Sequence, residues 1–145
     1  MIEADIKKYE LEISANCNAQ CPLCARTEMG MPLRGNSEIS LENIMNLFKT
    51  EESVKGKEFK LCGVLGDPIV HPQCLEICEW LGSKGGNVII STNGGYNTPE
   101  WWSKLAKVKN LKVDFSVDGF EETNHIYRVN AVSYTHLRAH ETNSN

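Results

Sequence analysis

The chain has 145 residues, of which 41% are hydrophobic and 23% are charged, and these values suit one soluble globular domain. Its formal net charge of −4 disfavours a surface that coats nucleic acid. No apolar run approaches the roughly 20 residues that span a bilayer, and the N-terminal segment lacks the apolar stretch of a secretory signal. We therefore expect a cytoplasmic protein with no membrane partner.

Alternating or β-branched runs predict four strands, and apolar residues at helical spacing predict helices between them. Ser40 and Thr98 are expected N-caps, and Pro99 follows the second of them at the first helical position. In chain order the segments are strand 9–14, helix 41–48, strand 58–65, helix 72–81, strand 87–92, a helix from residue 99 and strand 111–119.

This alternation of strands and helices, with short connections, predicts an α/β fold with a parallel sheet. In the last strand, Val113, Phe115 and Val117 alternate with polar residues. A parallel sheet that is buried on both faces has nearly continuous apolar strands, so one polar face suits a barrel wall with helices outside. We therefore expect a partial, TIM-like (βα) barrel with its site where the strands end.

Six cysteines occur, at positions 17, 21, 24, 62, 74 and 78. Disulfides would require a secreted chain, and nothing indicates secretion, so Cys62, Cys74 and Cys78 are expected to be small buried apolar residues. Residues 17–24, CNAQCPLC, place three thiols on one short loop, which indicates metal binding. Structural zinc sites usually close with four ligands. A [4Fe–4S] cluster held by three cysteines instead leaves one iron open.

The loop matches the CxxxCxφC motif of the radical S-adenosylmethionine (radical SAM) family, which the chain resembles over about residues 9–130. Leu23 occupies the φ position. After the second, third and fourth predicted strands, the sequence resembles three further motifs of the family, which are GGEP, TNG and S-[IV]-D-G in that order. The resemblance therefore implies metal ligands Cys17, Cys21 and Cys24, and SAM contacts from Leu23, Gly66, Asp67, Pro68, Thr92, Asn93, Ser116 and Asp118.

Two departures stand in the second motif, where Leu65 replaces the first glycine and Asp67 replaces glutamate. The form G-x-x-G-D-P-x-x-H-P over residues 63–72 looks like a variant among peptide-modifying (SPASM/twitch-type) members. His125 and Arg128 fit the H-x-x-R continuation of the fourth motif. A peptide is therefore the first expectation for the substrate, with small molecules and RNA left open.

The resemblance implies an enzyme whose cofactors are a [4Fe–4S] cluster and SAM, with a reductant such as flavodoxin or ferredoxin as partner. Reductive cleavage of SAM would yield a 5′-deoxyadenosyl radical that abstracts hydrogen from the substrate. The polar strand faces would line the interior, with Glu12, Asp114, Ser116 and Asp118 as candidates, and no catalytic acid or base is identified. The family core has six βα units, of which about four are present, so we expect residues 1–130 to be a truncated core domain that is unstable or inactive alone.

Two alternatives concern the metal and the end of the chain. A non-catalytic module that binds zinc or an electron-transfer cluster would need a fourth ligand, for which Cys62 and His71 are the candidates. Residues 131–145 lack periodicity, and SYTHLRAHET resembles a translated sequencing adapter, so we expect a non-native or disordered tail. His136 and His140 are accordingly not expected to bind metal.

Overall fold

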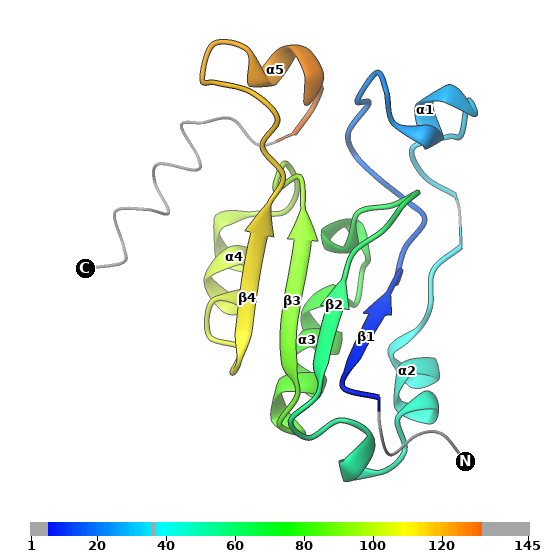
Figure 1. The fold of residues 1–145 in the computed structure, drawn as a ribbon, viewed down its shortest axis with the longest axis vertical. Helices are drawn as coiled ribbons and strands as arrows, with labels where there is room; N and C mark the ends of the chain where they lie inside the picture. The colour runs from blue at the N-terminus through cyan, green and yellow to red at the C-terminus, as the bar shows by residue number, and fades with distance from the viewer. Residues whose placement is uncertain (1–5, 36, 132–145) are drawn as a thin grey trace.

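A computed structural model describes residues 6–35 and 37–131 of the chain. Four strands form one sheet in the order β1-β2-β3-β4, and all three neighbouring pairs are parallel (Figure 1). The parallel α/β fold predicted from the sequence is therefore confirmed. The strands are β1 (Lys8–Leu11), β2 (Glu58–Leu61), β3 (Asn87–Thr92) and β4 (Leu111–Phe115).

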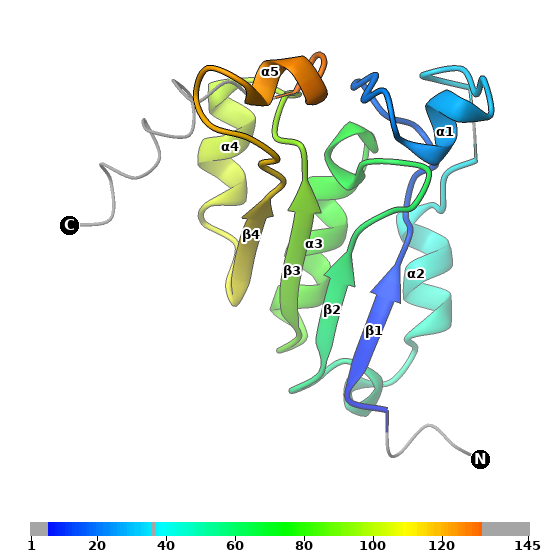
Figure 2. The same ribbon diagram turned by 45° about the horizontal axis from the view of Figure 1, so that its top comes forward.

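Three helices cover one face of this sheet, as Figures 1 and 2 show. They are α2 (Leu41–Leu47), α3 (Cys74–Ser83) and α4 (Pro99–Leu105). The shorter α1 (Ala25–Glu28) and α5 (Asn124–Tyr127) lie beyond the ends of the strand arrows in both views. Two 3₁₀ turns, η2 (Glu51–Ser53) and η3 (Pro68–Val70), complete the elements. Among the described residues, no helix has the length and apolar character needed to cross a membrane.

The two faces of the sheet differ sharply in character. Phe59, Leu61 and Ile90 are fully buried on the face that the helices cover. The rings of Tyr9, Phe48 and Phe59 pack together there, with centroids 5.0 to 5.2 Å apart. Because neighbouring strand residues point to opposite faces, the intervening residues form the other face, which is polar as predicted. That face carries the ion pairs Lys8–Glu58, Lys60–Glu10 and Lys112–Asp114.

The predicted strands 9–14, 58–65 and 111–119 were too long at their C-terminal ends. The residues that follow each strand leave the sheet and form loops around the candidate site. The Leu65 N–H, for example, donates to the Glu12 carboxylate at 2.7 Å and not to a neighbouring strand. The sequence pattern also missed α1, η2 and η3, because elements of three or four residues are too short to show a periodicity. Apart from Ala131, the predicted tail lies outside the described residues.

The expected N-caps are confirmed, and that of α4 gives a testable stability effect. The Thr98 hydroxyl accepts a hydrogen bond from the Trp101 N–H at 3.3 Å. We expect Thr98→Ala to lower the free energy of unfolding by about 1 kcal/mol in urea denaturation. Ser103→Ala, at an exposed position inside the same helix, is the matched control and should be neutral or slightly stabilising. Equal losses in both variants would contradict a capping role for Thr98.

Candidate functional site

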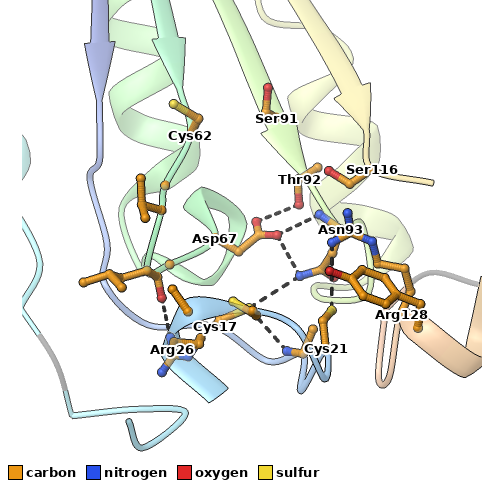
Figure 3. Close-up of a pocket in the computed structure, with 18 residues that line it drawn as sticks. Cys17, Cys21, Arg26, Cys62, Asp67, Ser91, Thr92, Asn93, Ser116 and Arg128 are labelled. Carbon is orange, nitrogen blue, oxygen red and sulfur yellow. Dashed lines mark hydrogen bonds between the residues drawn. The ribbon is translucent and has the colours of Figure 1, made fainter. Parts of the chain in front are cut away.

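A pocket of about 380 Å³ opens where the strands end, and this volume suits a cofactor-sized ligand (Figure 3). It is formed by the cysteine loop and by the loops that follow β2, β3 and β4. The strand ends of parallel α/β folds are where ligands usually bind. Of the residues predicted from sequence, the pocket is lined by Cys17, Cys21, Cys24, Gly66, Asp67, Thr92, Asn93 and Ser116.

The cysteine loop holds its three thiols at this pocket. Cys24 is the N-cap residue of α1, and its N–H donates to the Cys21 carbonyl at 3.1 Å. The Cys17 sulfur accepts a hydrogen bond from the Ala19 N–H at 3.4 Å and one from the Asn93 side chain at 3.7 Å. Burial raises the pKa of the Cys17 thiol, whereas the Ala19 N–H lowers it. The Cys17 sulfur therefore has one N–H donor from its own loop and one from the turn after β3, and hydrogen bonds of this kind tune the potential of a cluster bound by thiolates.

The donor atoms at the pocket bear on the kind of metal. Three thiols on one pocket wall suit a [4Fe–4S] cluster, because cysteine thiolates are the protein ligands of such clusters. Among residues 6–35 and 37–131, no three His, Cys, Asp or Glu side chains form a group that could hold a single metal ion. That these cysteines are the cluster's ligands stays a prediction.

Asp67 joins the loop after β2 to the turn after β3. Its carboxylate accepts hydrogen bonds from the Thr92 hydroxyl, the Asn93 N–H and the Asn93 side chain, each at 2.7 Å. The Ile69 N–H adds a fourth at 3.2 Å. Burial raises the pKa of the Asp67 carboxyl, and these donors oppose the rise. The side chain thus holds two of the predicted motifs in register, and Asn93 continues the link to Asn18 on the cysteine loop at 3.1 Å.

Gly66 lies against the backbone that leads from β1 into the cysteine loop. A Cβ at this position would lie 1.7 Å from the Ser14 carbonyl oxygen and 2.6 Å from its carbon. The Asp67 N–H donates to the Asn16 carbonyl at 2.8 Å in the same contact. Only glycine permits this approach, which brings the loop after β2 against the segment that leads into the cysteine loop, and Gly66 itself lines the pocket.

The segment after β4 closes the remaining side of the pocket. Arg128 forms a salt bridge with Asp118, and its guanidinium also lies 3.9 Å from the Cys21 sulfur. The Gln20 N–H donates to the Val129 carbonyl at 3.0 Å. The H-x-x-R continuation therefore contacts the cysteine loop, more than 100 residues earlier in the chain.

Comparison with known proteins accounts for this arrangement. The family model described as "Radical SAM superfamily" matches residues 11–142. The chain belongs to the radical SAM superfamily. Its members use a [4Fe–4S] cluster and SAM, and the three cysteines of the CxxxCxφC motif stand together at the pocket of this chain. The resemblance seen in the motifs is therefore confirmed at the level of the superfamily.

Two curated relatives are similar to this radical SAM chain over most of its length. The tungsten-containing aldehyde ferredoxin oxidoreductase cofactor-modifying protein of Pyrococcus furiosus is 29% identical over 115 residues, which are 78% of this chain and 31% of that protein. The AdoMet-dependent heme synthase of Methanosarcina barkeri is 26% identical over 114 residues, or 79% of this chain and 32% of that protein. The chain thus spans about a third of the length of these relatives.

A solved structure shares the fold. The crystal structure of BtrN in complex with AdoMet and 2-DOIA aligns with a TM-score of 0.59 and 14% identity. The match covers 83% of this chain and 51% of that one. The sheet and helices described above are therefore part of a fold that another protein uses in a complex with AdoMet. The peptide-modifying branch of the superfamily stays a prediction.

Several predicted residues of the radical SAM site lie away from the pocket lining. Leu23 is 74% exposed, Pro68 is buried in η3, and Asp118 pairs with Arg128. Glu12 and Asp114, expected as lining, instead bind the Leu65 N–H and Lys112 respectively. Their contacts to SAM or substrate stay predictions.

Cys62 and His71, the two candidates for a fourth metal ligand, differ in whether they line the pocket. Cys62 is only partly buried and lines the pocket, unlike Cys74 and Cys78, which are buried in the core as predicted. The expectation that Cys62 is a buried core residue was therefore wrong. His71 is turned away, because Nε2 bonds the Ile39 carbonyl at 2.9 Å and Nδ1 accepts the Gln73 N–H at 2.9 Å. Both nitrogens of His71 thus hold loops together.

Sequence reasoning missed Arg26, a buried cation that also lines the pocket. Its only signal in the sequence is a position two residues after Cys24. An arginine at the start of a short helix is usually exposed, so nothing in the local pattern indicates its burial.

Replacing Asp67 tests whether its carboxylate organises the radical SAM pocket. In Asp67→Asn, an amide N–H₂ replaces one acceptor oxygen and meets donors that it cannot bond. We expect a loss of about 2–4 kcal/mol in the free energy of unfolding, measured by urea denaturation. Asp114→Asn is the control, since that carboxylate is 44% exposed and pairs with Lys112 at the surface. It should cost less than about 1 kcal/mol. Similar effects in the two variants would contradict the role assigned to Asp67.

Proposed function

We propose that Cys17, Cys21 and Cys24 bind a [4Fe–4S] cluster whose fourth iron is left for SAM. The single observation that carries the proposal is the placement of three thiols from one loop on the wall of one cofactor-sized pocket. When bound, the cluster supplies the electron that cleaves SAM into methionine and a 5′-deoxyadenosyl radical, which abstracts hydrogen from the substrate. On this proposal residues 1–130 are part of a radical SAM core domain.

The residues around the thiols would bind and orient SAM. Gly66 lines the pocket, and a backbone carbonyl beside it would accept a hydrogen bond from the amino group of SAM. Thr92 and Asn93 are held by Asp67, so they would contribute to a rigid wall. The Ser116 hydroxyl lines the pocket beside them and would meet the ribose or carboxylate. The hydrogen bonds that hold Thr92 and Asn93 in place favour preorganised binding.

The substrate and the electron donor are further parts of the proposal. The G-x-x-G-D-P-x-x-H-P form supported a peptide substrate, but His71 of this form serves the fold and does not line the pocket. The names of the curated relatives mention a cofactor-modifying protein and a heme synthase, and neither mentions a peptide. A small-molecule substrate is therefore at least as well supported. A flavodoxin or ferredoxin would supply the electron.

Reductive cleavage of SAM tests this proposal. The full chain is reconstituted anaerobically with iron and sulfide, mixed with SAM and dithionite, and assayed for 5′-deoxyadenosine by mass spectrometry. 5′-Deoxyadenosine that forms only with the reductant, and not with a variant in which all three loop cysteines are serine, would support the proposal and would overturn the expectation that the chain is inactive alone. A fully loaded [4Fe–4S] cluster that neither yields 5′-deoxyadenosine nor changes its electron paramagnetic resonance spectrum when SAM is added would contradict the proposal.

A further inference from the structure

Arg26 is a charged side chain in an unusual setting. It is only 2% exposed, and its guanidinium donates hydrogen bonds to the carbonyls of Ala15 at 3.0 Å and Leu65 at 2.6 Å. A third goes to the Pro32 carbonyl. These carbonyls come from the segment after β1, the loop after β2 and the loop after α1. Arg26 thus connects the loops that surround the cysteines, as Figure 3 shows in part.

The charge of Arg26 has no anionic partner within the part of the chain that the structure describes. The salt bridges found among these residues do not include it. The Nε of Arg26 is buried and has no hydrogen-bond partner. Among residues 6–35 and 37–131, it is the single buried side-chain nitrogen or oxygen atom that lacks one. Arg128, the other arginine of the pocket, is paired with Asp118. A buried charge without a counter-charge is costly, so protein interiors normally pair it.

The position of Arg26 indicates where its counter-charge belongs. Arg26 lines the same pocket as Cys17, Cys21 and Cys24, and it lies two residues after the last of them. A [4Fe–4S] cluster bound by three thiolates carries a net negative charge, and one-electron reduction makes it more negative. A fixed cation beside it stabilises the reduced form more than the oxidised form.

We infer that Arg26 is a positioning and charge-compensating residue for the cluster, and that its positive charge raises the reduction potential of the cluster. The inference rests on the proposed function, because it requires the cluster at the three cysteines. It accounts for the buried charge, which hydrogen bonds to three neutral carbonyl groups leave without a counter-charge. Outer-shell groups of this kind commonly tune bound metals.

Arg26 could instead serve only to hold the loops together. Two substitutions separate this structural role from the role of its charge. Arg26→Lys keeps the charge but loses the fork that reaches three carbonyls, whereas Arg26→Gln loses the charge and keeps an amide donor. Both should lower the stability of the fold, so stability does not discriminate between them. The reduction potential does, because it responds to charge.

The experiment is a redox titration, followed by electron paramagnetic resonance, of the reconstituted full chain and its variants. We expect the Gln variant to be about tenfold harder to reduce, a potential lower by about 59 mV for a one-electron couple. The Lys variant should lie close to the wild type. Arg34→Gln is the charge control, since Arg34 is exposed, lies over the Tyr96 ring and does not line the pocket. Its potential should be unchanged.

The possible results separate this inference from the proposed function. A wild-type chain that binds no [4Fe–4S] cluster overturns both. A wild-type cluster with the same potential in the Gln variant, or equal shifts in the Gln and Lys variants, overturns the inference alone. If the Gln variant holds no cluster, wild-type loading and potential in the Lys variant support the role of charge. If neither variant binds the cluster although both have circular dichroism spectra like that of the wild type, the role of Arg26 is purely geometric. That result overturns the inference.

Discussion

Serine in place of Cys17, Cys21 or Cys24 is expected to abolish stable cluster binding. Each single variant should fall from about four irons per reconstituted chain to below about one, because a three-thiolate site has no spare protein ligand. The loss should appear together in iron analysis and in the visible absorption of the cluster. The circular dichroism spectrum should stay close to that of the wild type, since the core lies on the helix-covered face of the sheet.

Cys62→Ser is the matched control for these variants. Cys62 lines the same pocket but follows β2 and lies outside the cysteine loop. We expect this variant to keep its iron and its spectrum. If it loses iron as fully as the loop variants do, the site has four protein ligands. That result would leave no open iron for SAM and would favour a closed metal-binding module.

Gly66→Ala is expected to have the largest effect of any single methyl group added at the site. The new Cβ would overlap the Ser14 carbonyl, which belongs to the backbone and has no rotamer to change. We expect the variant to lose about 3 kcal/mol or more in the free energy of unfolding, at the upper end for overpacked sites. Where it still folds, the cysteine loop must shift, so SAM binding measured by calorimetry should be lost.

Gly30→Ala provides the comparison for Gly66→Ala. Gly30 has a φ of +64° and open space around its Cα, so alanine there meets backbone strain but no clash. A cost of about 1–2 kcal/mol and unchanged SAM binding are expected. If the Gly66 variant behaved like the Gly30 variant, the close approach of the two loops would not matter for the site.

Much of this site could be predicted because its residues follow strands directly. The strand pattern placed the loops that carry Cys17, Asp67, Asn93 and Ser116 at one edge of a parallel sheet, and the structure brings them to one pocket. The N-caps of α2 and α4 could also be predicted, because Ser40 and Thr98 bond N–H groups three residues away. Local chemistry decided these features.

Contacts between distant segments could not be predicted in this way. The carboxylate of Asp67 bonds Thr92 and Asn93, and nothing in the sequence around Asp67 indicates these partners. Arg26 is buried only because three loops meet around its guanidinium. Cys62 was expected in the core, but it lies just after β2 in the pocket lining, next to the buried Leu61. Each of these outcomes depends on tertiary packing, which no local pattern records.

The central claim is that three thiolates hold a cluster with one iron left for SAM. Mössbauer spectroscopy of the reconstituted chain, with and without SAM, tests it most directly. We predict that one of the four iron sites differs from the other three and that its signal alone shifts when SAM is added. A cluster whose four irons are equivalent and indifferent to SAM would contradict the claim.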